Sequence, residues 1–176
     1  MKNILSMLYV IKYTCALFLI VAGYTSNAQS NLKNFSGTWL LNEEKCDLGT
    51  LSKASASKVK TVTISQTEEQ IRIQSGDSTA SSSTVLRLNG KPSEQTLMTL
   101  VNDIPNMSTK SISLKIMNSQ SFISTMKDQG GFLSLSVKTY TISGDGLLLT
   151  ITFNNTYDNQ VVAGKLVYDK KQELRN

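Results

Sequence analysis

Apolar and polar residues alternate along most of the chain after residue 36. Val62 and Ile64 are separated by threonine, and segments 112–116 and 147–153 carry an apolar residue at every second position. A period of two places these apolar side chains on one face of a strand. Because no long segment has the 3.6-residue period of a helix, the pattern predicts an all-β fold.

The alternation divides the chain into ten strand candidates. They lie near residues 37–41, 59–66, 70–75, 83–88, 95–101, 111–117, 121–127, 132–143, 147–154 and 161–169. On most of them serine, threonine and lysine occupy the face opposite the apolar one, as expected where one face is buried. The succession of strands and turns predicts an antiparallel up-and-down β-barrel of eight to ten strands.

The connections between these strands differ in length. Three are short, at 67–69, 118–120 and 144–146, and the last reads Gly-Asp-Gly, a typical hairpin turn. Longer polar gaps fall at 42–58, 76–82, 102–110, 128–131 and 155–160. Since alternate connections of a meander lie at the same end, the sequence predicts tight turns at one end of the barrel and a mouth ringed by long loops at the other.

One strand candidate changes parity within its own length. Leu135 and Val137 share one face, whereas Tyr140 and Ile142 have the opposite parity. A β-bulge near residues 138–139 would restore one continuous inward face. The alternative is that two shorter strands meet at a bend.

The first strand carries the only tryptophan of the chain. Phe35, Trp39 and Leu41 share one face, and Gly37 lies between them, where a side chain would crowd a neighbouring backbone. An aromatic residue followed by Gly37-Thr38-Trp39 resembles the Gly-x-Trp signature that opens the barrel of lipocalins.

Two further segments extend this resemblance. The stretch 35–45 is similar to the start of secreted bacterial lipocalin-like (calycin) proteins, and segments 88–92 and 140–150 are similar to hairpins found in them. The resemblance implies a lipocalin-like barrel with Gly37 and Trp39 as its structural signature. It also implies a cation over the indole, for which the candidates are Lys170, Lys171 and Arg175.

The N-terminus has the features of a signal peptide. Lys2 and Lys12 supply positive charge before an apolar run of about ten residues, 13–22, and Ser26-Asn27-Ala28 offers a cleavage site. We therefore expect residues 1–28 to be removed, leaving a barrel domain at 29–176 that is secreted or periplasmic and does not span a membrane. Cleavage lowers the formal net charge from +5 to +3, and without a Lys/Arg cluster this small excess argues against a nucleic-acid partner.

The inventory of reactive side chains argues against catalysis. The chain has no histidine, the commonest general base and zinc ligand. After cleavage only Cys46 remains, which excludes an internal disulfide and leaves two interpretations, a small buried hydrophobe or a reactive, dimer-forming thiol. We expect no enzyme activity, no catalytic residue, no metal and no cofactor.

The leading functional hypothesis is non-catalytic binding of a small hydrophobic or amphipathic molecule inside the barrel. Segment 42–58 is the candidate lid. The ligand-binding candidates of the interior and mouth are Leu51, Ile73, Leu114, Ile116, Phe122, Met126, Leu135, Tyr140, Ile151 and Phe153.

Two alternatives accompany this hypothesis. A filled barrel would make the protein a structural module of the cell envelope that contacts a protein partner through its loops. An integral outer-membrane barrel would need an apolar exterior and aromatic girdles, and the chain has too few aromatic residues for these.

Overall fold

The computed structural model describes residues 32–49, 60–76, 81–101, 104–129, 133–157 and 160–172. All of them belong to one compact unit, Leu32–Asn176. The predicted signal peptide, residues 1–28, lies outside the described residues.

Ten strands and one short 3₁₀ turn make up this unit. They are β1 (Gly37–Leu41), η1 (Glu43–Lys45), β2 (Thr61–Gln66), β3 (Gln70–Gly76), β4 (Ser81–Arg87), β5 (Ser93–Val101), β6 (Ile104–Asn118), β7 (Ser121–Gln129), β8 (Leu133–Ile142), β9 (Leu148–Tyr157) and β10 (Gln160–Lys170). The predicted all-β class is confirmed, at the upper end of the expected strand number.

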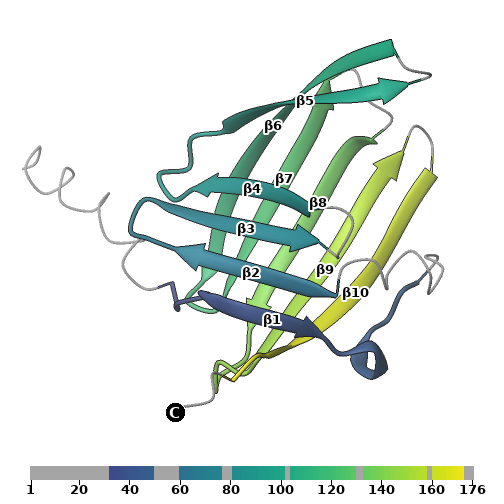
Figure 1. Ribbon diagram of the computed structural model, residues 1–176. Coiled ribbons are helices and arrows are strands. Elements are labelled where there is room, and N and C mark those ends of the chain that lie inside the picture. Colours follow the sequence, from purple (N-terminus) through teal and green to yellow (C-terminus); the bar gives the residue numbers. More distant parts are fainter. Residues whose placement is uncertain are drawn as a thin grey trace, which may run out of the picture. The chain divides into compact units, whose positions relative to one another are not determined.

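The strands form a single antiparallel sheet in the order β4-β3-β2-β1-β10-β9-β8-β7-β6-β5. β1 pairs with β2 on one side and with β10 on the other, so it joins the two ends of the chain. In Figure 1, β1–β4 cross in front of β6–β10, which gives a flattened and nearly closed barrel.

The two edge strands, β4 and β5, are linked by side chains instead of a ladder. The Ser93 hydroxyl donates to the Val85 carbonyl at 2.6 Å, and the Gln95 amide donates to the Ser83 carbonyl at 3.1 Å. These bonds satisfy edge carbonyls that would otherwise lack a strand partner.

The hydrophobic core lies on the inner face of the sheet. Its buried members include Phe35, Trp39, Val62, Ile64, Ile71, Ile73, Leu86, Ile112, Leu114, Phe122, Tyr140, Ile142, Leu149, Ile151 and Tyr168. Almost every strand contributes to it through alternate residues, and each large apolar side chain removed from water stabilises the fold by about 1.5–3 kcal/mol.

The segment before β1 closes one end of the barrel. The Lys33 backbone N–H donates to the Ser119 carbonyl at 2.7 Å, and the Lys33 ammonium donates to the Gly144 carbonyl at 2.8 Å. Lys33 thereby connects two of the tight turns predicted for this end. Phe35 follows it into the core and packs edge-on against Phe122, with 4.9 Å between the ring centroids.

Trp39 is buried beside this closed end, and a cation covers its ring as expected. The Lys170 ammonium lies 5.2 Å from the indole centroid, and the indole N–H donates to the Phe35 carbonyl at 3.1 Å. Gly37 makes room for Lys170, because a Cβ at this position would lie 2.9 Å from the lysine Cε. Its φ of 145° is a second reason for glycine.

Long loops were predicted at the end opposite the closed one, and this prediction is wrong for most of the connections there. Only two residues separate Val101 from Ile104, and two separate Tyr157 from Gln160, because the strands run through the polar segments read as gaps. Polar composition suggested loops there. Backbone pairing continues regardless, since a strand tolerates polar side chains on both faces where neither belongs to the core.

The predicted bulge near residues 138–139 is also wrong. The β7–β8 ladder runs without interruption from Ser121–Thr141 to Lys127–Leu135. The observed irregularity lies at the start of β8, between Leu133 and Leu135 in the pairing with β9. The bulge was inferred because apolar residues were assumed to face inward along the whole strand, and this assumption fails in the first half of β8.

Replacing Lys170 by methionine should lower the free energy of unfolding by about 1 kcal/mol, since the cation over the indole is lost while most of the stem remains. Denaturant titration followed by Trp39 fluorescence measures this change. Lys171→Met is the matched control, because Lys171 is exposed and bonds Thr38 only through its backbone. Equal stabilities of the two variants would contradict the prediction.

Candidate ligand site in the barrel interior

Most of the predicted ligand-binding residues line the inner face. Six are buried in the core: Ile73, Leu114, Phe122, Tyr140, Ile151 and Phe153. Ile116 and Met126 are partly buried and pack against the same cluster. Leu51 lies outside the described residues.

Leu135 does not face the interior. It pairs with Lys127 of β7, whereas the inward residues of β8 are Ser136, Lys138 and Tyr140. Because successive residues of a strand point to opposite faces, Leu135 lies on the outer face of the barrel. Its assignment to the ligand site is therefore corrected.

Aromatic side chains form the floor of the interior. The Phe122 and Tyr140 rings are stacked, with centroids 4.7 Å apart, and Phe35 meets Phe122 from the closed end. Burial raises the pKa of the Tyr140 hydroxyl, so it stays neutral at any physiological pH. The floor is thus apolar and uncharged.

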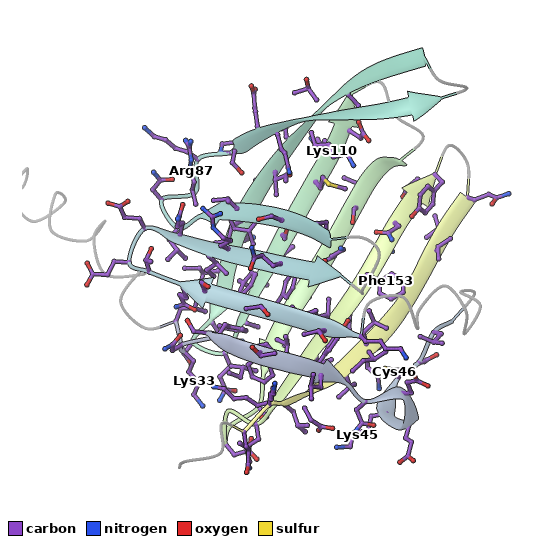
Figure 2. All side chains as sticks on the ribbon, viewed as in Figure 1. Lys33, Lys45, Cys46, Arg87, Lys110 and Phe153 are labelled. Atoms are coloured by element: carbon purple, nitrogen blue, oxygen red, sulfur yellow. The ribbon has the colours of Figure 1, made fainter. Side chains whose placement is uncertain are left out.

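Beyond this floor the inner face becomes polar. Lys110 pairs in register with Asp128, and their charged groups approach to 3.8 Å. The Ser136 hydroxyl donates to the Asn155 side chain at 2.7 Å. Lys110 lies far from Lys33 of the closed end (Figure 2). The interior is therefore graded from apolar at the closed end to charged toward the opposite end.

Lys138 is the least expected member of this polar layer. It stands opposite Ser124 on β7 and opposite Phe153 on β9. Burial lowers the pKa of its ammonium, and repulsion by Lys110 lowers it further. Within the described part of the chain, Lys138 has neither a carboxylate partner nor a hydrogen bond.

Sequence reasoning missed Lys110, Asp128 and Lys138, although a signal was present. Lys138 has the parity of Tyr140 and Ile142, so it follows them to the inner face unless a bulge intervenes. The inferred bulge removed Lys138 from the interior, and segment 102–110 was taken for a loop.

The chain after β1 stays attached to the barrel wall. Backbone bonds join Asp47 to Lys165 in both directions. Gly164 allows this approach, because a Cβ there would lie 2.9 Å from the Asp47 carbonyl oxygen and 2.6 Å from the Phe153 ring. Phe153 consequently lies close against the β10 backbone.

Cys46 takes a structural part in this attachment. Its thiol accepts the Val167 backbone N–H at 3.3 Å and donates to the Asn42 carbonyl at 3.1 Å. The sulfur thus bonds to the β10 backbone at the point where η1 interrupts the pairing of the chain with β10. Of the two interpretations of this cysteine, these contacts favour the partly buried structural one.

A separate pocket of about 300 Å³ lies on β2–β4, at the ends remote from the closed end. Hydroxyl and amide side chains line it, and none of its lining residues is charged: Thr61, Thr63, Gln74, Ser75, Gly76, Ser82 and Ser83. It is distinct from the charged layer, which β6, β7 and β8 carry.

Among the described residues, no three His, Cys, Asp or Glu side chains gather closely enough to hold a metal ion. In the same part of the chain, no helix has the length and hydrophobicity needed to cross a membrane.

Comparisons with known proteins give only distant similarities. No family model matches the chain, and no curated protein matches it. Among solved structures, the chain is similar to one described as "REP1-NXSQ fatty acid transporter", with 11% identity and a TM-score of 0.48, covering 78% of this chain and 96% of that one. A mutant of the same transporter gives 11% identity and a TM-score of 0.46, covering 77% and 97%. Similarity at this level assigns neither a family nor a function.

The burial of Lys138 predicts a pH-dependent stability. Its pKa is lower in the folded chain than the usual 10.5. Between the two values the unfolded chain binds a proton that the folded chain does not, so stability rises with pH across this window. Lys138→Met should therefore be more stable than the wild type at about pH 7, and its advantage should shrink toward about pH 10.

Urea titrations of both proteins across this range measure the difference. Tyr140 and Tyr168, whose pKa values burial raises, favour unfolding above their ordinary value of 10.0, but both proteins contain them and the effect cancels. Lys115→Met is the control, because Lys115 is exposed on the outer face of β6. A constant difference between wild type and Lys138→Met would contradict the expectation.

Proposed function

We propose that the barrel binds and carries a small hydrophobic or amphipathic molecule in its interior. The observation that supports this most is that some inward-facing apolar side chains remain partly accessible. Met126, Val162 and Leu166 have inward parity, yet none is fully buried. Side chains that face inward and keep accessible surface line space that protein atoms do not fill.

The polar layer supports carriage over a merely filled barrel. A solid core gains nothing from an unpaired cation, because burying an ammonium without a partner is destabilising. Lys138 is a partly buried cation that faces inward without a partner among the described residues, and a bound anionic group would supply one. The alternative, a filled structural module of the envelope, has no comparable explanation for this residue.

We further propose that carriage is non-catalytic and that the chain is a secreted bacterial lipocalin-like (calycin) protein. The absence of histidine from the sequence removes the commonest general base. The segments 35–45, 88–92 and 140–150 support the family proposal. Export through the leader 1–28 agrees with both.

Binding is tested with a fluorescent fatty-acid probe and with native mass spectrometry of protein purified from its own host. We expect the probe to bind, and a co-purified small molecule to be recovered unchanged after incubation. Met126→Trp should weaken probe binding about tenfold or more by filling interior space, whereas Lys127→Trp, on the exposed outer face, should leave it unchanged. A wild-type protein that binds neither probe nor host molecule would support the filled barrel.

Export is tested by sequencing the N-terminus of protein secreted by a Gram-negative host. We expect the mature chain to begin at Gln29. Ala28→Leu should block cleavage, because the last residue of the site must be small, and Asn27→Leu should not, because the position before it is unrestricted. A wild-type protein that keeps Met1 in the cytoplasmic fraction would overturn the localisation.

A further inference from the structure

The charged layer of the interior contains more cations than anions. Lys110 and Lys138 both have inward parity, and Asp128 is the only carboxylate among the described residues that shares it beyond the floor. The Asp128 side chain is 5% exposed and that of Lys110 is 20% exposed, so solvent screens this group weakly. The layer therefore carries one uncompensated positive charge when both lysines are protonated.

The hydrogen bonding of this layer is incomplete as well. Asp128 reaches Lys110 through Oδ2, while its Oδ1 is buried and has no partner within the described residues. Lys138 faces the interior, is partly buried and has no acceptor within the described residues either. Inward-facing polar groups normally find partners, so the unpaired ammonium of Lys138 indicates an acceptor that is still to be bound.

We propose that Lys110 and Lys138 bind the carboxylate of a singly charged amphiphile, and that Asp128 keeps Lys110 in position. This rests on the proposed carriage function and specifies the chemistry of the molecule carried. One carboxylate neutralises the excess charge and provides the acceptors that Lys138 lacks. A headgroup with two negative charges would carry more negative charge than this layer has to neutralise.

The surroundings of Lys138 suit an apolar tail attached to this carboxylate. Phe153 lies directly across the β8–β9 ladder from Lys138. The neighbouring inward positions include Met126, paired with Ser136, and Leu166, paired with Ile151. Apolar side chains thus flank the cationic position on both sides along the barrel wall.

The test compares three ligands of equal chain length, namely hexadecanoic acid, hexadecanol and hexadecyltrimethylammonium, each below its critical micelle concentration. Affinities are measured by displacement of an uncharged fluorescent lipid probe. We expect the acid to bind at least about tenfold more tightly than the alcohol, as one charge-assisted hydrogen bond would produce. The cation should bind most weakly.

The same measurements on Lys138→Met should abolish the preference for the acid while leaving the affinity for the alcohol nearly unchanged. Lys115→Met, which removes an exposed outer lysine, should retain the full preference. Lys138→Gln provides a polar second variant, and the Trp39 fluorescence of each variant verifies its fold.

Equal affinities for acid and alcohol in the wild type, or an undiminished preference in both Lys138 variants, would overturn the carboxylate site while leaving ligand carriage intact. Failure of all three ligands and of the probe to bind would instead overturn carriage itself.

Discussion

Closure of the sheet through β1 is the constraint on which the rest of the structure depends. This strand has only five residues, yet it is hydrogen-bonded to β2 on one side and to β10 on the other. Its Trp39 is fully buried and covered by Lys170, so the strand that joins the two ends of the chain is also anchored in the core. Without it the meander would have four edges to protect in place of two.

The apolar packing at the closed end of the barrel allows the interior to be polar toward the other end. The stacked rings of Phe122 and Tyr140 and the crossing segment at Lys33 fill the end near the tight turns. The burial of these apolar side chains contributes to the free energy of unfolding, which is small in most native proteins. The barrel can therefore tolerate a layer containing Lys110, Asp128 and Lys138, whose burial opposes folding.

This division of the interior links the fold to the proposed function. A partly buried cation without a protein partner is destabilising, and such a residue is retained most readily where a ligand offsets the loss of stability. The edge between β4 and β5, bridged by Ser93 and Gln95, leaves the barrel closed by side chains at one seam. Under the proposed function, such a barrel would combine an apolar floor with an interior whose excess charge is neutralised by the bound molecule.

The sequence by itself predicted the existence of ten strands and the turns near residues 118–120 and 144–146, because periodicity and turn chemistry are local properties. The cation over Trp39 was implied by the resemblance to lipocalins. The sequence also assigned Leu135 and Tyr140 opposite parity, but the inferred bulge between them would have placed both side chains inside. Only the tertiary structure decided which face of the strand is inside. Parity fixes the relation between residues of one strand, whereas the inward face is set by pairing with β7 and β9, and that pairing brings Lys138 inside and leaves Leu135 outside.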